Sequence, residues 1–131
     1  FPAADIRHVH MGVPDPLASV TAPAGEIRRR YGIPDDAVVF GSFGRVTPEK
    51  GLRAILRGLA QVARALPSIR LLIVGGASAH FDPMADAREL GVVDRVIDAG
   101  YVPAEQLPGH LAATDVCLNL RWPTGRERSS A

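Results

Sequence analysis

Apolar residues recur at helical spacing between residues 52 and 66. Seven of them would share one face of a helix: Leu52, Ile55, Leu56, Leu59, Val62, Ala63 and Leu66. Four polar residues would occupy the opposite face: Arg53, Arg57, Gln61 and Arg64. This period of about 3.6 residues predicts an amphipathic helix that packs one side against a core.

Short apolar runs alternate with helical patterns along the rest of the chain. We expect strands over residues 38–43, 69–74, 95–99 and 115–120. We expect shorter helices over 26–31, over 82–91 with Asp82 as N-cap, and around Pro108. Strands that alternate with helices pair in parallel through right-handed crossovers. The sequence therefore predicts an α/β fold, a Rossmann-like three-layer α/β/α arrangement with a parallel sheet.

Composition fits one folded domain. The chain has 131 residues, of which 47% are hydrophobic and 22% charged, and this balance is typical of globular proteins rather than disordered ones. Fifteen basic and fourteen acidic side chains give a net charge of +1, without the basic excess of nucleic-acid-binding proteins. Cys117 is the only cysteine, which excludes an internal disulfide and favours a reducing, cytoplasmic location. No apolar run reaches the ~20 residues of a membrane-spanning helix.

The loop after the first predicted strand has the features of an anion site. In open α/β sheets, ligands bind beyond the carboxyl ends of the strands. Thr47 and Pro48 suit the start of the long helix, whose free N–H groups would then face a ligand. Arg45 and Lys50, the one lysine of the sequence, would add two cations beside Gly44. The alternative is that Gly44 is a turn glycine and both cations are solvated.

This loop departs from two well-known phosphate-binding patterns. A P-loop requires Gly-Lys-Ser/Thr, whereas Lys50 is followed by Gly51 and Leu52. Gly41 and Gly44 lack the spacing of the dinucleotide fingerprint. Nucleotide hydrolysis and simple NAD binding are therefore disfavoured.

Three further loops would share the same edge of the sheet. Gly75 and Gly76 would permit a close backbone approach, unless they form only a tight turn. Tyr101 is either a half-buried packing residue or a stacking surface for a flat ring, in a turn whose backbone could pair with that ring. The last loop follows Leu120 and is polar.

Taken together, these loops resemble the donor-binding half of a retaining glycosyltransferase of the two-domain GT-B type, group 1 (family 4). The resemblance runs from about Met11-Gly12-Val13, within the segment His10-Met11-Gly12-Val13-Pro14, to the last residue. It rests on five motifs in order: that segment, Gly-Arg-x-x-x-Glu-Lys-Gly at residues 44–51, the strand 71–75, Gly100-Tyr101-Val102, and Ala113-Thr114-Asp115-Val116. A nucleotide-diphosphate sugar, such as a UDP- or GDP-sugar, is the substrate that the resemblance implies.

The resemblance also implies roles for individual residues. Arg45 and Lys50 would hold the diphosphate without a metal ion, and no other cofactor is expected. The base would lie against the backbone at Tyr101 and Val102, with Leu107 beneath it. Glu127 would be the first glutamate of a Glu-x7-Glu motif, contacting the transferred sugar. A carboxylate suits this role because it accepts bonds from two hydroxyls, although pairing with Arg126 or Arg128 is the alternative.

By the same resemblance we expect residues 1–131 to be one incomplete donor-binding domain. Residues 1–17 would be an interdomain linker or an edge strand. The second glutamate of the motif and the acceptor domain are missing, so we expect the chain alone to be inactive and its uncovered sheet edge to promote self-association. The acceptor, which could be a glycan, a lipid or a small molecule, is unknown, and peripheral membrane contact of the full-length protein is compatible with the pattern.

The remaining reactive side chains are expected to be structural. The four histidines, His8, His10, His80 and His110, lack a carboxylate at ligand spacing and are interpreted as surface or packing residues rather than metal ligands. Cys117 falls in a predicted buried strand and is interpreted as core. Rival hypotheses are a non-catalytic nucleotide-binding module, an interaction module, and a dehydrogenase-type domain that lacks its fingerprint.

Overall fold

A parallel sheet forms the centre of the molecule in the computed structural model, which describes residues 24–121. The strands are β1 (Val39–Phe43), β2 (Arg70–Val74), β3 (Val96–Gly100) and β4 (Val116–Cys117), in the order β3-β2-β1-β4. The helices are α1 (Ala24–Arg30), α2 (Leu52–Val62), α3 (Pro83–Glu89) and α4 (Leu107–Ala112). Every neighbouring pair of strands is parallel. The predicted α/β class and parallel sheet are confirmed.

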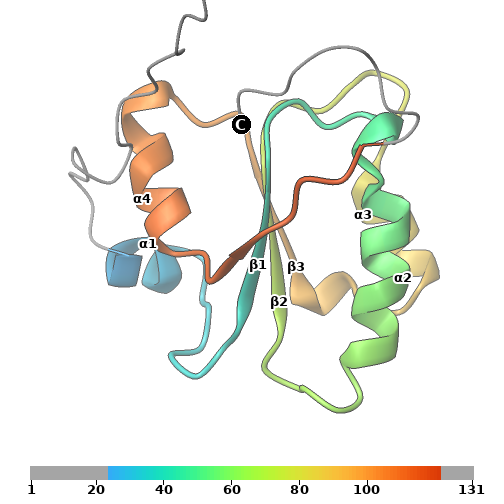
Figure 1. Cartoon of the computed structure of the whole chain (residues 1–131), viewed down its shortest axis with the longest axis horizontal. Coiled ribbons are helices and arrows are strands. Elements are labelled where there is room, and N and C mark those ends of the chain that lie inside the picture. The colour runs from blue at the N-terminus through green and yellow to red at the C-terminus, as the bar shows by residue number, and fades with distance from the viewer. Residues whose placement is uncertain (1–23, 122–131) are drawn as a thin grey trace, which may run out of the picture.

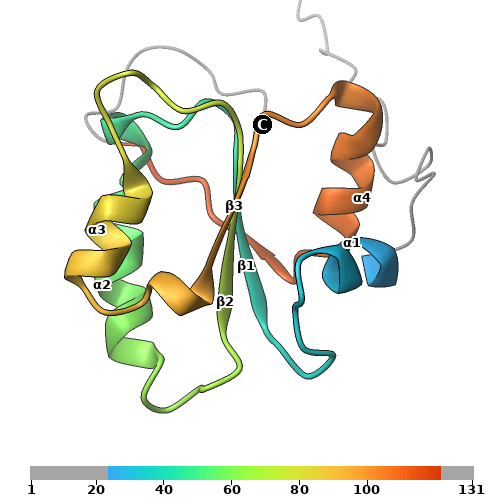
Figure 2. The same cartoon turned by 180° about the vertical axis from the view of Figure 1, so that it is seen from behind.

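The sheet lies between two layers of helices. Figure 1 shows α2 and α3 on one face and α1 and α4 on the other, and Figure 2 shows the same layers from behind. The three-layer α/β/α arrangement is therefore also confirmed. None of the helices between residues 24 and 121 has the length and apolar character that crossing a bilayer requires.

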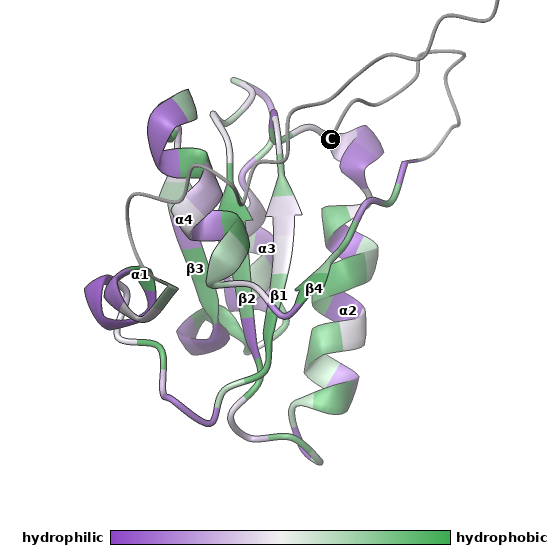
Figure 3. Ribbon diagram, turned by 60° about the vertical axis from the view of Figure 1, so that its left-hand side comes forward, coloured by the Kyte–Doolittle hydropathy of each residue, from purple (hydrophilic) through white to green (hydrophobic). Residues whose placement is uncertain are grey.

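Alternation along β2 supplies both halves of the core. Leu71 and Ile73 are buried among the residues under α2 and α3, while Leu72 and Val74 are buried on the face of α1 and α4. Burial of each such side chain stabilises the fold by about 1.5–3 kcal/mol. Figure 3, coloured by hydropathy, shows β2 as largely green, and it shows both green and purple residues along α2.

The long helix begins at Leu52, where its apolar pattern begins, but it ends before Leu66 and lacks the predicted Thr47 cap. Thr47 and Pro48 begin a separate 3₁₀ turn, Pro48–Lys50, and the Thr47 side chain makes no capping bond to it. Gly51, with φ 65°, stands at the start of α2 instead. The helix ends at Val62, and Val62 and Leu66 are exposed. The prediction that Thr47 caps the long helix is therefore wrong, because Gly51, in the left-handed conformation, separates the 3₁₀ turn from α2.

The last strand also differs from its prediction. β4 pairs only at Val116 and Cys117, and both are exposed. Within the predicted strand 115–120, only Val116 and Cys117 form a strand, and the interpretation of Cys117 as a core residue is wrong. The apolar composition of residues 115–120 indicated a buried strand. β4 is instead the last strand of the described sheet and pairs only with β1, so its residues are less covered than those of a central strand. Self-association through this edge stays a prediction.

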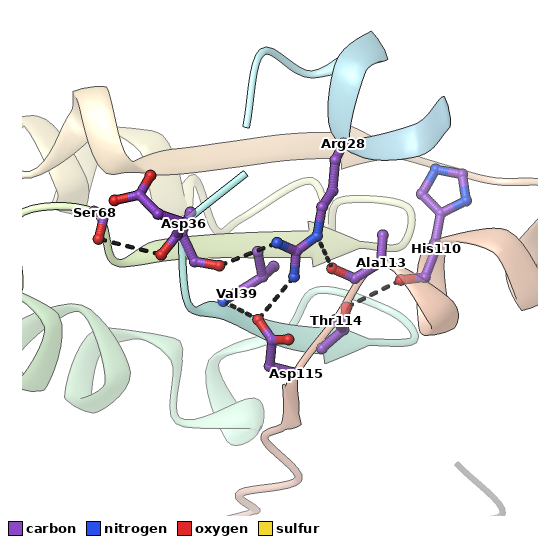
Figure 4. Close-up of polar contacts among 9 residues, drawn as sticks. Arg28, Asp36, Val39, Ser68, His110, Ala113, Thr114 and Asp115 are labelled. Carbon is purple, nitrogen blue, oxygen red and sulfur yellow. Dashed lines mark hydrogen bonds and ion pairs between the residues drawn. The ribbon is translucent and has the colours of Figure 1, made fainter. Parts of the chain in front are cut away.

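A polar cluster joins the elements at the amino ends of the strands. The Arg28 guanidinium donates to the Ala37 and Ala113 carbonyl oxygens and to the Asp115 carboxylate, the last at 2.8 Å. Asp115 also accepts from the Val39 backbone N–H at 2.7 Å. Figure 4 shows this cluster, in which Arg28 links α1 to the starts of β1 and β4.

Candidate nucleotide-sugar site

A cavity of about 730 Å³ opens where the strands end. The chain beyond β1 contributes Phe43, Gly44 and Arg45, and the chain at the end of β2 contributes residues 74–77. Further lining comes from residues 101–102 after β3, from α4, and from residues 117–119 at β4. Residues at or after the ends of all four strands therefore line one cavity, as expected for ligand sites in open α/β sheets.

The loops after β1 and β2 are held against each other. The Gly44 N–H donates to the Val74 carbonyl at 2.9 Å, and the Val46 N–H donates to the Gly76 carbonyl at 3.0 Å. A Cβ on Gly75 would lie 2.0 Å from the Gly44 carbonyl oxygen, and its φ is 157°. Only glycine permits this approach. The structure thus shows a close backbone approach at Gly75, between the loops after β1 and β2, and the role of Gly75 at a ligand stays a prediction.

The two predicted cations differ in their positions at the cavity. Arg45 is exposed and lines the wall. Lys50 is absent from the lining, and its Nζ donates to the Phe43 carbonyl at 2.7 Å. That ammonium lies beside Gly44, since a Cβ built there would be 3.1 Å from Nζ. An ammonium has three N–H donors, so the bond to Phe43 does not exhaust its capacity.

Electrostatics around this turn disfavour the charged form of Lys50. Burial lowers the pKa of the Lys50 ammonium, and the charge of Arg121 lowers this pKa further. The pKa of the neighbouring Glu49 is lowered mainly by a hydrogen bond from the Thr47 side chain. The charge of Arg121 thus acts in opposite senses on the two neighbours: it disfavours the Lys50 ammonium and favours the Glu49 carboxylate. An anion near Lys50 and Arg121 would relieve the repulsion.

The turn after β3 forms another part of the wall. Val102 and Leu107 are partly buried against the core, whereas Tyr101 is 79% exposed. The interpretation of Tyr101 as a half-buried packing residue is therefore wrong. Gly44, Arg45, Gly75, Gly76, Tyr101, Val102 and Leu107 all line the cavity, as the sequence led us to expect.

Some lining residues were missed by sequence reasoning. Leu111 on α4 and Cys117, Leu118 and Asn119 also face the cavity. The signal for the last three was available, since they follow a strand that is parallel to the others. Glu127 lies outside the described residues, as do His8 and His10, so the predicted sugar contact is untested.

Among the described histidines, His110 is fully buried. Its Nδ1 lies 2.9 Å from the Gln106 carbonyl, and its Nε2 lies 3.1 Å from the Tyr31 hydroxyl. A carbonyl only accepts, so Nδ1 donates to the Gln106 carbonyl, and the Tyr31 hydroxyl can pair with Nε2 as donor or as acceptor. His80 is exposed. The packing and surface interpretations of these two residues are confirmed. Within residues 24–121, no three His, Cys, Asp or Glu side chains cluster closely enough to hold a metal ion.

Comparison with known proteins agrees with this arrangement. A curated relative from Mycolicibacterium smegmatis, the GDP-mannose-dependent alpha-(1-6)-phosphatidylinositol monomannoside mannosyltransferase, is 36% identical over 121 residues, which are 88% of this chain and 30% of the relative. The chain thus spans about 30% of that relative's length.

Solved structures show the same fold. WaaG, a glycosyltransferase of lipopolysaccharide biosynthesis, matches with a TM-score of 0.65 at 20% identity, over 85% of this chain and 28% of that protein. Anabaena HepE in complex with UDP and glucose matches with a TM-score of 0.60 at 23% identity, over 81% of this chain and 27% of that protein. Both likenesses concern the fold. The family model "Glycosyl transferases group 1" matches residues 24–121. The chain belongs to the group 1 glycosyltransferase family.

Proposed function

We propose that this chain binds the nucleotide-diphosphate sugar donor of a retaining hexosyltransferase, a UDP- or GDP-sugar. The observation that supports the proposal most is the cavity lined from all four strand ends, with the Arg45 side chain in its wall. The transfer reaction belongs to the whole protein, of which the chain corresponds to about 30% in the mannosyltransferase relative. Retention of configuration follows from the family resemblance alone.

The diphosphate would lie over the loop after β1. Arg45 would reach it from the cavity wall, and Lys50 would reach it from the turn beside Gly44. Cleavage of the sugar–phosphate bond leaves additional negative charge on the departing diphosphate. Cations that are already in place stabilise such charge as it develops. Arg45 and Lys50 would therefore assist departure of the nucleotide as well as its binding.

The other ends of the donor would occupy the remaining walls. We place the base at the backbone of Tyr101 and Val102, above Leu107, because the family resemblance puts it there and these three residues line the cavity. Gly75 and Gly76 would let the backbone approach the donor closely. Glu127 would hold the sugar hydroxyls. The acceptor stays unassigned among glycans, lipids and small molecules, and peripheral membrane contact of the whole protein stays a prediction.

We further propose that the donor binds without a metal ion, because two cations supply the charge that a divalent ion would otherwise provide. Calorimetric titration with a nucleoside diphosphate should give the same affinity with and without a chelator. A cytoplasmic location is proposed from the single cysteine, which fits a reducing compartment.

Calorimetry tests the donor site directly. UDP, GDP, ADP and NAD are titrated into the chain and into Arg45→Ala, Lys50→Ala and Arg57→Ala. Arg57 is an exposed arginine on α2 outside the cavity lining and serves as the matched control. One nucleoside diphosphate should bind, and each site variant should weaken it about 10- to 100-fold, since a hydrogen bond to a charged group contributes about 1.5–3 kcal/mol. Arg57→Ala should bind normally.

Other outcomes would contradict the proposal. Preference for NAD would indicate a dehydrogenase-type domain instead. Binding that ignores both Arg45→Ala and Lys50→Ala would place the nucleotide elsewhere. Absence of any binding by a chain that circular dichroism shows to be folded would favour an interaction module.

A further inference from the structure

A second cavity, of about 440 Å³, lies beside the cavity assigned above to the donor, which we call the donor cavity. The second cavity is formed by the loop between β2 and α3, by the first residue of α3 and by one residue of β3. Within the described chain its lining consists of Ala77, Ser78, Ala79, His80, Phe81, Asp82, Pro83 and Asp98. Ala77 lines both cavities, so a ligand in the second cavity would be a neighbour of the donor.

The loop that lines the second cavity is anchored at both ends. At its start, Val46 and Ala77 form a parallel bridge, and the Ser78 N–H donates to the Val46 carbonyl at 3.0 Å. At its other end, Phe81 packs against the core under α2 and α3, and the Asp82 carboxylate caps α3 by accepting from a backbone N–H at 2.8 Å. A cavity with walls held in this way loses less entropy when a ligand binds.

Asp98 reaches the second cavity from the sheet. Val96 is buried in the core under α2 and α3, and alternation along β3 directs Asp98 to the same side. The register with β2 shifts directly after Asp98, which makes Ala99 a β-bulge. One Asp98 carboxylate oxygen accepts from the Gly100 N–H at 3.0 Å, and the other has no hydrogen-bond partner within residues 24–121. This second oxygen is available to a ligand.

The lining disfavours several kinds of ligand. Asp82 and Asp98 bring two negative charges, and no described residue of the lining is a lysine or arginine that could hold an anion. Arg88 lies 3.9 Å from Asp82, but both side chains are 63% exposed, and such an ion pair is weak. His80, Asp82 and Asp98 are too far apart to share a metal ion, since no three such groups cluster within residues 24–121. An apolar ligand would leave these polar groups unpaired.

A ring with several hydroxyl groups and an amine suits this lining. Carboxylates accept from hydroxyl and ammonium groups, whereas a serine hydroxyl and a neutral imidazole can each donate and accept. Phe81 and Pro83 contribute apolar surface for the carbon skeleton of such a ring. An ammonium on the ring would form a charge-assisted hydrogen bond with the available oxygen of Asp98.

We infer that the second cavity binds a polyhydroxylated ring that carries an amine, and that this ring belongs to the acceptor. The binding itself is argued from the lining, whereas the acceptor role rests also on the proposed function. The two cavities share Ala77 and otherwise have different linings. Donor and acceptor would therefore bind side by side, each on its own walls.

Glucosamine, glucose and glucose 6-phosphate test this inference, because they share one ring and differ in charge. Each is titrated into the isotopically labelled chain near neutral pH, and the backbone amide resonances are followed by NMR. Glucosamine should shift the resonances of residues 77–82 and of Asp98. Glucose should bind about 2- to 5-fold more weakly, as expected for loss of an ion pair at an exposed site, and glucose 6-phosphate more weakly still. Equal affinities for the three sugars, or shifts confined to other residues, would overturn the inference.

A carboxylate variant identifies the residue that recognises the amine. Asp98→Asn removes the charge and keeps an oxygen that accepts from the Gly100 N–H. This variant should weaken glucosamine about 2- to 5-fold and leave glucose unchanged. Asp94→Asn, at an exposed position outside the lining, is the matched control and should bind both sugars normally. Equal losses of glucosamine affinity in the two variants would indicate a general effect of charge and would contradict the role of Asp98.

Simultaneous titration with a nucleoside diphosphate tests the acceptor role. A saturating nucleoside diphosphate should leave the glucosamine-induced shifts of residues 77–82 in place, and displacement of glucosamine would overturn the second cavity as a separate site. If the nucleotide binds and glucosamine shifts none of these resonances, the inference fails and the donor site stands. If glucosamine binds and no nucleoside diphosphate does, the proposed function fails and the acceptor role fails with it, while the amine-binding cavity stands.

Discussion

At the scale of single residues, Lys50 shows how surroundings alter a predicted role. The sequence indicated a cation near a phosphate, and the structure places the ammonium on the Phe43 carbonyl, beside the wall rather than in it. Burial and the charge of Arg121 lower the pKa of this ammonium. The unfolded chain therefore binds the proton more tightly than the folded chain. Stability should rise with pH between the lowered pKa and the ordinary value of about 10.4.

A bound diphosphate should reverse this effect. Its negative charge favours the ammonium, so binding should raise the pKa of Lys50 and take up protons near the lowered pKa. We expect diphosphate affinity to fall as pH rises through that pKa, at a pH below about 10.4. Calorimetry in buffers of different ionisation enthalpy measures the proton uptake directly. Lys50→Arg is the control, because a guanidinium stays charged throughout this range. Identical pH profiles for the two chains would contradict the role of Lys50.

Other single residues show which information a sequence lacks. The Arg45 position could be predicted, because an arginine directly after a strand end must lie near the ligand edge. The exposure of Tyr101 and Cys117 could not, because it depends on the β3 bulge and on the edge position of β4. An apolar pattern predicts that a strand exists. Which of its residues are buried depends on the position of the strand in the sheet, which the pattern does not give.

At the scale of elements, periodicity predicted which helices and strands exist better than where they end. The apolar spacing of α2 and the Asp82 N-cap of α3 are both present in the structure. The cap of α2 was misassigned because Thr47 and Pro48 are typical of any helical first turn, including a 3₁₀ turn. The choice between them depends on Gly51, whose positive φ is set by the fold around it.

Two glycine substitutions test the close contact between the loops after β1 and β2. Gly75→Ala should destabilise the chain by about 2–4 kcal/mol, because its Cβ would collide with the backbone of Gly44 and its φ is unfavourable. Gly58→Ala is the matched control inside α2, where no atom lies within 4 Å of the added Cβ. It should stabilise the chain by about 0.5–1 kcal/mol. Urea unfolding measures both. Similar effects from the two substitutions would refute the close contact between the two loops.

At the scale of the whole molecule, the carboxyl ends and the amino ends of the strands have different roles. The carboxyl ends hold the cavity, with its exposed cation and aromatic ring. The amino ends hold the Arg28 cluster, which joins α1 to the starts of β1 and β4 (Figure 4). This separation allows stability and binding to be altered independently, since the cluster and the cavity share no residue.

Arg28 tests that separation. Its guanidinium, 16% exposed, donates to two carbonyls and to Asp115. Arg28→Ala should lower the free energy of unfolding by about 2–4 kcal/mol, and Arg28→Lys by less, because an ammonium retains the charge without the planar fork. Arg29→Ala, at an exposed position of the same helix, should change it by less than about 0.5 kcal/mol. At a temperature where all the chains are folded, nucleoside diphosphate affinity should match in all of them. A loss of affinity in Arg28→Ala would mean that the amino-end cluster shapes the donor site across the length of the strands.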